Sequence, residues 1–312
     1  MSTILGHHHI SMLVKNARET DRFYRKIMGL RRVKVTVNQD DPSMYHLFYG
    51  DQVGNPGSGL TFFEMPNIGR THHGTNAITR IGLMVPTEES LSYWKARFEE
   101  ADVYHGSRTT FAQRPALKFE DPDGLRLVLV VAGDDEKADF QPVIASEVPV
   151  EHQIRGMGPI EITVRDGDRF SHTLTELMGY RPVYKNQMDS LFQTVNADSY
   201  GEILVREEDG PFERPGRGSV HHLAVRVKEP DELTHWDQMA KDNHFASSGL
   251  VDRYYFESLY FRESNGILFE IATDGPGYSV DQDVAHLGEK LVLPPFLEAR
   301  RKEIESQLTP ID

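Results

Sequence analysis

Residues 78–98, ITRIGLMVPTEESLSYWKARF, and residues 220–240, VHHLAVRVKEPDELTHWDQMA, follow one pattern. In each, a strand-like run ends in valine, a proline and acidic residues follow, and the next segment places a leucine three residues before one of the chain's two tryptophans. A second matching pair, 119–130 (FEDPDGLRLVLV) and 261–272 (FRESNGILFEIA), adds an acidic turn, a glycine and another strand-like run. This internal repeat decides the fold before any single motif does.

Two further copies of the repeat are looser. Residues 16–30 carry Asn16 and Glu19 as a helix-start pair and Gly29 as a helix stop, and residues 166–180 repeat the apolar face and the Met-Gly ending. We therefore predict an α+β fold of four units, each a strand, a helix and three more strands (βαβββ). The units lie near residues 6–65, 77–132, 157–206 and 219–274.

The four units suggest a division of the chain into two domains. Residues 1–135 and 156–280 would each form a domain from two consecutive units. A polar, acidic stretch over 136–155 would join them, and residues 281–312 would form a C-terminal extension with a helix after a Pro-Pro pair.

Composition excludes several classes of protein. The chain has 312 residues, of which 38% are hydrophobic, so it can build real cores. A net charge of −14 argues against nucleic acid or an anionic membrane as the main partner. There is no cysteine, no membrane-length apolar run and no signal-peptide pattern, so we expect a soluble, cytoplasmic protein.

Equivalent places in the four units carry different side chains. Five residues before the valine that ends the first strand stand His9, Arg80, Pro159 and His222. Four residues after the glycine of the last strand stand Phe63, Val128, Val205 and Glu270. Only units one and four supply metal-ligand side chains, and two imidazoles with one carboxylate form the facial set typical of non-haem iron oxygenases. A site built from these two units requires the two ends of the chain to meet.

Each of these residues also has a simpler interpretation. A His-His pair is most often a polar strand end, and Glu270 could pair with Arg253 or Arg262. The occurrence of all three ligand types at equivalent positions favours the metal site. We expect His7 to be a solvent-exposed strand end and His46 to be strand packing.

The quoted segments resemble the vicinal oxygen chelate superfamily, which includes glyoxalase I, fosfomycin-resistance proteins and extradiol dioxygenases. More narrowly, the chain resembles bacterial hydroquinone-type ring-cleaving dioxygenases. The matching stretches, spread over nearly the whole chain, are GHHHISMLV, VKVTVNQDDPSMYHLFYGDQVGNPGSGLTFFEMP, GRGSVHHLAVRV, YFRESNGILFEIATDGPGYSVD and LGEKLVLPPFLEARR.

The resemblance implies a fold, a cofactor and a set of ligands. The four units would form two glyoxalase-like domains with curved mixed sheets. Fe(II) would be bound by His9, His222 and Glu270, and Mn(II) suits the same ligands.

The resemblance also assigns residues around the metal. His8, His221, Arg253 and Tyr260 would be catalytic, with a neutral-range imidazole moving protons and Arg253 and Tyr260 also binding the substrate or its developing oxyanion. Ser11 stands where such proteins often have threonine and keeps the hydroxyl for substrate binding.

The implied activity is ring cleavage of a hydroquinone-type or catechol-type diol by O2, in aromatic catabolism or quinone detoxification. Two alternatives stay open. One is a glyoxalase-like metal-dependent isomerase or thiol transferase, which would need a fourth ligand where Phe63 stands, with Glu64 one step out of register. The other is a metal-free protein that sequesters small molecules. Proteins of this type are often dimers or tetramers, so a homo-oligomer fits the resemblance.

Overall fold

A computed structural model describes residues 3–133, 140–195 and 200–311. The first of its two eight-stranded sheets runs in the order β14-β15-β16-β13-β1-β4-β3-β2 and so joins units one and four. In chain order its strands are β1 (His7–Val14), β2 (Arg31–Val37), β3 (Tyr45–Gly50), β4 (Gly59–Glu64), β13 (Ser219–Val227), β14 (Ala246–Asp252), β15 (Phe256–Arg262) and β16 (Leu268–Pro276).

The second sheet joins units two and three in the order β10-β11-β12-β9-β5-β8-β7-β6. Its strands are β5 (Ala77–Val85), β6 (His105–Phe111), β7 (Arg114–Glu120), β8 (Arg126–Val131), β9 (Met157–Val164), β10 (Arg181–Lys185), β11 (Asp189–Gln193) and β12 (Glu202–Glu207). In every unit the first and last strands pair in parallel and the other strands pair antiparallel. The mixed α+β architecture predicted from the repeat is therefore confirmed.

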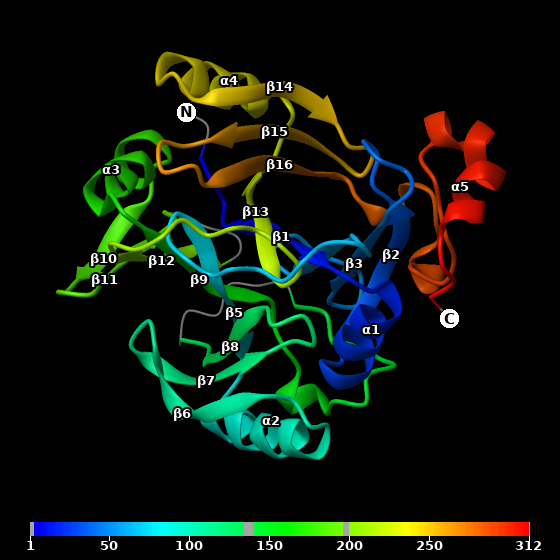
Figure 1. Cartoon of the computed structure of the whole chain (residues 1–312), viewed down its shortest axis with the longest axis horizontal. Coiled ribbons are helices and arrows are strands. Elements are labelled where there is room, and N and C mark those ends of the chain that lie inside the picture. Colours follow the sequence, from blue (N-terminus) through cyan, green and yellow to red (C-terminus); the bar gives the residue numbers. More distant parts are fainter. Residues whose placement is uncertain (1–2, 134–139, 196–199, 312) are drawn as a thin grey trace.

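The association of units differs from the expected one. Each sheet takes one unit from either side of the stretch 136–155, through the antiparallel pairs β1–β13 and β5–β9. Units one and two therefore do not share a sheet, and neither do units three and four. Units one and four instead meet through β1 and β13, as a shared site requires (Figure 1). The physical reason is that any first strand of a unit offers a free edge to any other, and the repeat alone does not select the partner.

A helix follows the first strand of each unit. The predicted signals at the start of the chain are confirmed, since the Asn16 side chain accepts from the Glu19 amide at 3.0 Å and Gly29 has a φ of +70°. The helices are α1 (Ala17–Asp21), α2 (Glu88–Glu100), α3 (Gly167–His172), α4 (Asp231–Asp242) and the C-terminal α5 (Arg301–Gln307). None of the helices in the described ranges is long and apolar enough to cross a membrane.

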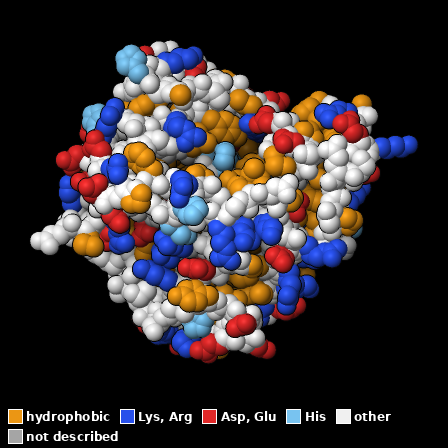
Figure 2. All heavy atoms as spheres, viewed as in Figure 1, with side chains coloured by type: hydrophobic (Ala, Val, Ile, Leu, Met, Phe, Trp, Pro, Cys, Tyr) orange, Lys and Arg blue, Asp and Glu red, His pale blue; other side chains and the backbone are white. Residues whose placement is uncertain are grey.

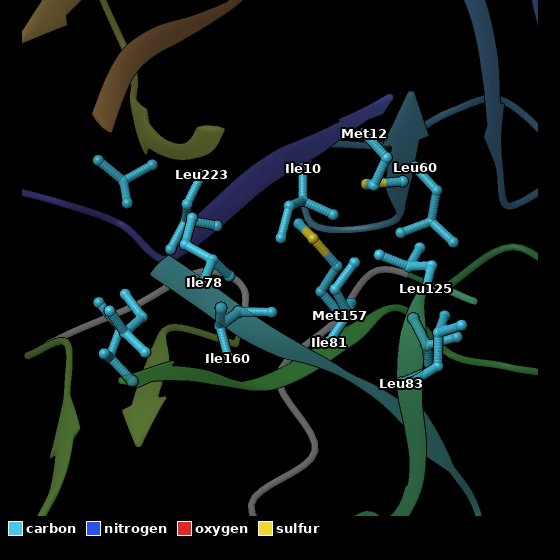
Figure 3. Packing of buried hydrophobic residues seen from close by; sticks show 14 of the residues in the cluster. Ile10, Met12, Leu60, Ile78, Ile81, Leu83, Leu125, Met157, Ile160 and Leu223 are labelled. Carbon is cyan, nitrogen blue, oxygen red and sulfur yellow. The ribbon is translucent and has the colours of Figure 1, made fainter. Parts of the chain in front are cut away.

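The main hydrophobic core lies between the two sheets. Figure 3 shows Ile10 and Met12 of the first sheet facing Ile81 and Met157 of the second. All four side chains are buried, and each such burial contributes about 1.5–3 kcal/mol of transfer free energy. Because strand side chains alternate, this packing turns the neighbouring residues of β1 away from the core, onto the opposite face of the sheet.

The C-terminal segment covers the β2 edge of the first sheet, as the position of α5 beside β2 in Figure 1 indicates. Leu291 forms a bridge with Val35, and the fully buried Lys34 ammonium donates to Asp281 at 2.6 Å. An edge strand covered in this way cannot pair with another chain.

Candidate metal centre

Two β-bulges bring neighbouring histidines together. Where β1 pairs with β13, His8 is an additional residue on β1 and His221 is an additional residue on β13. In a regular strand consecutive side chains point to opposite faces, but here the Nδ1 atoms of His8 and His9 are 2.8 Å apart. The Nδ1 atoms of His221 and His222 are also 2.8 Å apart. The bulges therefore place His8 in contact with His9 and His221 in contact with His222.

Three buried donor atoms converge at the centre of the first sheet. Oε2 of Glu270 lies 2.8 Å from Nε2 of His222 and 3.3 Å from Nε2 of His9, and the two Nε2 atoms are 3.4 Å apart. The side chains are 0%, 4% and 2% exposed, respectively. These are the three residues identified from the repeat, and their positions on β16, β13 and β1 bring them together as predicted.

The electrostatics of this group suit a cation. Burial alone would raise the pKa of Glu270, but the adjacent His9 and His222 hold it well below its usual range, so the carboxylate is charged. Its Oε1 accepts from Ser258 at 2.6 Å, whereas Oε2 has no well-oriented hydrogen-bond donor among the described residues. A buried carboxylate oxygen without a donor is costly, and a metal ion would compensate it.

His8 determines which nitrogen of His9 faces Glu270. His8 Nε2 lies 3.1 Å from the carbonyl oxygen of Thr273, which can only accept, so this nitrogen carries the proton. Burial, followed by the effect of His9, lowers the pKa of His8 to about 3, so the ring is neutral and its Nδ1 must accept from His9. With the Nδ1 proton directed to His8, Nε2 is the nitrogen of His9 that faces Glu270 and that can donate a lone pair to a metal. Two electron-pair donors facing each other fit a bound metal.

His8 itself does not line the cavity in front of the metal centre, although it was expected to contact the substrate. It lies behind His9, beside a smaller cavity of about 210 Å³. His7, expected to be a solvent-exposed strand end, is fully buried, and this prediction was wrong. Its Nε2 approaches the carbonyl of Glu202 at 3.2 Å, and burial lowers its pKa to about 4. The reason is that β1 begins against strand β12 of unit three, a contact that local sequence does not reveal.

A cavity of about 580 Å³ opens above the three donor atoms. Figure 2 shows a hollow on this face in which hydrophobic side chains surround a histidine. Of the residues predicted for the site, Ser11, His221, Arg253 and Tyr260 line the cavity together with the donor set. The apolar part of the lining consists of Leu13, Met44, Phe48, Phe63, Met65, Phe256 and Leu268. Such a lining suits a small aromatic ligand.

Arg253 and Tyr260 contact each other at the cavity wall. Arg253 Nε donates to the Tyr260 hydroxyl at 3.2 Å, and the guanidinium lies 5.2 Å from the centre of the tyrosine ring. The same guanidinium pairs with Asp40 at 3.0 Å, so it does not neutralise Glu270. Burial, and then the charge of Glu270, raises the pKa of Tyr260, which keeps the phenol protonated.

The counting of a fourth ligand position was wrong by two residues. Glu270 pairs with Ala224, two residues after His222. The equivalent residue in unit one, two residues after His9, is Ser11, and it pairs with Thr61 and not with Phe63. Thr61 is buried and its hydroxyl is 2.7 Å from that of Ser11. Glu64 accepts from the backbone at the start of α1 and faces away. Gly59 is the first residue of β4, whereas Gly266 lies two residues before β16, so a count from the glycine misplaces the residue.

One cavity residue was missed by the sequence analysis. His46, expected to be strand packing, lines the cavity, and its Nε2 is 3.0 Å from the Thr61 hydroxyl. The signal for it was strand alternation, which puts His46 and Phe48 of YHLFYG on one face. By contrast, His73 pairs with Glu213 at 3.4 Å and does not line the cavity.

Known proteins resemble this chain over most of its length. The model of the Glyoxalase/Bleomycin resistance protein/Dioxygenase superfamily matches residues 6–129. "Putative ring-cleaving dioxygenase MhqA" of Bacillus subtilis strain 168 is 47% identical, with 98% of each chain covered. "Chlorohydroquinone/hydroquinone 1,2-dioxygenase" of Sphingobium indicum is 28% identical, with 96% of this chain and 94% of the other covered.

A solved structure extends the likeness to the whole fold. The crystal structure titled as a putative dioxygenase from Bacillus subtilis superposes with a TM-score of 0.93 at 31% identity, covering 100% of this chain and 99% of the other. On the strength of the family model, the full-length relatives and the shared fold, the chain belongs to the glyoxalase/bleomycin resistance protein/dioxygenase superfamily.

Proposed function

We propose that the protein is a non-haem iron dioxygenase that opens the ring of a hydroquinone-type aromatic diol with O2. The observation that carries this proposal is the convergence of His9, His222 and Glu270 below an apolar cavity, where Oε2 of Glu270 has no well-oriented hydrogen-bond donor among the described residues. The names of two relatives, a ring-cleaving and a hydroquinone dioxygenase, support the same reaction class.

The three residues would hold the metal on one side. Two imidazole nitrogens and one carboxylate oxygen suit Fe(II), and Mn(II) fits the same donors. When bound, such an ion supplies open coordination positions for a phenolate oxygen and for O2, and a path for electrons between them. The carboxylate offsets part of the ion's charge, and the hydrogen bond from Ser258 fixes its second oxygen.

The surrounding side chains would orient the diol. Arg253 and the protonated Tyr260 present a cation and a hydroxyl to the cavity, so they can stabilise negative charge that develops on the ring oxygen. Ser11 offers a hydroxyl beside His9. His221 borders the cavity, and loss of water, followed by the effect of His222, lowers its pKa to about 4, so the ring is neutral near neutral pH and can accept a hydrogen bond from a substrate hydroxyl.

His8 has a different part in this proposal from the one suggested by resemblance. Because it contacts Nδ1 of His9 and not the cavity, it acts as a positioning residue that fixes the proton and orientation of His9. It does not exchange a proton with the substrate directly.

The two alternatives have weaker support. A glyoxalase-type site would need a fourth acidic ligand, and Thr61 stands in that register while Glu64 faces α1. A metal-free binding protein would keep Oε2 of Glu270 buried with only the imidazoles of His9 and His222 beside it.

The test is oxygen uptake by protein loaded anaerobically with Fe(II), after addition of 2-methylhydroquinone or catechol. We expect one O2 consumed for each ring opened, with Glu270→Ala inactive. Absence of uptake by protein that retains its iron would overturn the dioxygenase and favour an isomerase or transferase. Absence of both uptake and metal would favour a binding protein.

A further inference from the structure

His46 occupies a fixed place in the cavity wall. It projects from β3 between two aromatic rings, with the centroids of Phe48 and Phe63 each 4.0 Å from its own. Two aromatic neighbours leave the imidazole little freedom to rotate, so its nitrogens point in defined directions.

One nitrogen of His46 is engaged and the other is available. Nε2 contacts the Thr61 hydroxyl at 3.0 Å, and Thr61 contacts Ser11 at 2.7 Å, so a polar chain leads from His46 to the cavity floor beside His9. No described residue makes a hydrogen bond to Nδ1. Nδ1 is not fully enclosed by protein atoms. Because the ring lines the cavity, this nitrogen is accessible from it.

Two other polar side chains of the wall are already used by the protein. The Tyr255 hydroxyl donates to Asp281 at 2.9 Å, and the Gln39 amide donates to the Arg253 carbonyl at 2.7 Å. Nδ1 of His46, by contrast, has no partner among the described residues and is available to a ligand.

The charge state of His46 suits a neutral hydroxyl. Burial, followed by the nearby His9 and His222, holds its pKa well below 6.5, so the ring is neutral. A neutral imidazole bound to a threonine hydroxyl can either accept at Nδ1 or donate from it, because the hydroxyl adapts to either tautomer.

The position of His46 relative to the metal centre selects the shape of the diol. β3 is separated from β1 by β4, so His46 lies two strands from His9, on the side opposite Tyr260 of β15. A 1,2-diol keeps both oxygens near the metal, whereas a 1,4-diol directs its second hydroxyl across the cavity. We propose that Nδ1 of His46 binds the hydroxyl remote from the metal centre and thereby makes His46 the residue that selects 1,4-diols over 1,2-diols. This inference rests on the proposed function, because it presumes that one oxygen of the diol binds the metal.

The test is anaerobic calorimetry of the Fe(II)-loaded protein with hydroquinone, catechol and phenol. Phenol lacks the remote hydroxyl and catechol places it next to the first. For His46→Phe, which keeps the aromatic stack, we expect the affinity for hydroquinone to fall about 10-fold while the affinities for phenol and catechol change less than about 3-fold, as for loss of one hydrogen bond.

Two further variants separate the two nitrogens. The amide of His46→Asn reaches the place of Nδ1, and that of His46→Gln reaches the place of Nε2, toward Thr61. We expect His46→Asn to retain most of the preference for hydroquinone and His46→Gln to lose it. Equal loss for all three ligands, no loss in His46→Phe, or rescue by Gln and not Asn would overturn the proposal.

Oxygen uptake distinguishes failure of this proposal from failure of the enzyme assignment. Selective, His46-dependent binding of hydroquinone by wild-type protein that consumes no O2 would support the role of His46 and contradict the dioxygenase. Oxygen uptake with an unchanged ratio of kcat/KM for hydroquinone and catechol in His46→Phe would support the dioxygenase and contradict the role of His46.

Discussion

The two sheets have the same central architecture but carry different side chains there. The pair β1–β13 and the pair β5–β9 both run antiparallel, and both contain two register shifts. In the second sheet Thr79 is the additional residue on β5, at the place that His8 occupies on β1. The bulges therefore belong to the scaffold, and the metal-ligand character of the first sheet comes from its side chains alone.

In the second sheet the buried carboxylate of Glu161 is paired with arginine side chains. Glu161 of β9 lies 3.8 Å from Arg80 and 3.9 Å from Arg206, which also pairs with Asp189 at 3.0 Å. Arg80 stands in the place equivalent to His9. A fixed guanidinium there neutralises the carboxylate, whereas the first sheet has imidazoles beside its carboxylate, an arrangement that would suit a bound ion.

The largest effect on metal binding should come from removing the negative charge of Glu270. Glu270→Gln keeps the shape of the side chain but removes its anionic donor. We expect Fe(II) affinity to fall more than about 100-fold, beyond the range for losing a group that only supports a ligand. Iron content after dialysis measures this loss. The matched control is Val128→Ala at the equivalent place of the second sheet, and equal iron loss in the control would break the comparison.

Acid should destabilise the metal-free protein through the first sheet. His7 is neutral when folded because burial lowers its pKa from 6.5 to about 4, so the unfolded chain binds more protons between these values. The free energy of unfolding is therefore highest above pH 6.5 and decreases as the pH falls toward 4. For His7 alone the decrease is about 3 kcal/mol. Denaturant titrations at pH 7 and pH 4.5 should show a smaller difference for His7→Asn than for wild type. An identical difference would contradict a buried neutral His7.

The supporting histidine should have a smaller effect on the metal. Replacing His8 by Phe removes the acceptor that fixes the Nδ1 proton of His9, and we expect metal affinity to fall about 10- to 100-fold. The matched control is Thr79→Val, at the equivalent bulge of the second sheet. Competition with a fluorescent chelator gives the affinities, and a His8 variant that binds iron like wild type would exclude the positioning role.

The smallest effect should come from the second sheet. Arg80→Met leaves Glu161 with the more distant Arg206, and we expect a loss of about 1–2 kcal/mol in the free energy of unfolding. Iron content and oxygen uptake should stay unchanged. A loss of iron in this variant would mean that the two sheets are coupled in a way that their separate side-chain clusters do not indicate.

Features encoded locally or by the repeat could be read from the sequence. The cap at Asn16, the stop at Gly29 and the triad of His9, His222 and Glu270 all follow from spacing within units. These positions depend on strand length and helix signals, which the repeat preserves.

Features that depend on pairing between distant strands could not be read. The pairing of β1 with β4 places Thr61, not Phe63, in the fourth position, because Gly59 begins β4 whereas Gly266 precedes β16 by two residues. The burial of His7 depends on a contact with unit three, about 200 residues away in the chain. The pairing of unit one with unit four likewise depends on which strand edges meet.

The most direct test of the central claim is an anomalous-scattering map at the iron absorption edge from crystals grown anaerobically with Fe(II). We predict one strong peak within bonding distance of Nε2 of His9, Nε2 of His222 and Oε2 of Glu270, and no peak beside Arg80 and Glu161. A protein with no peak at the three donors, or with iron bound elsewhere, would contradict the assignment of this site.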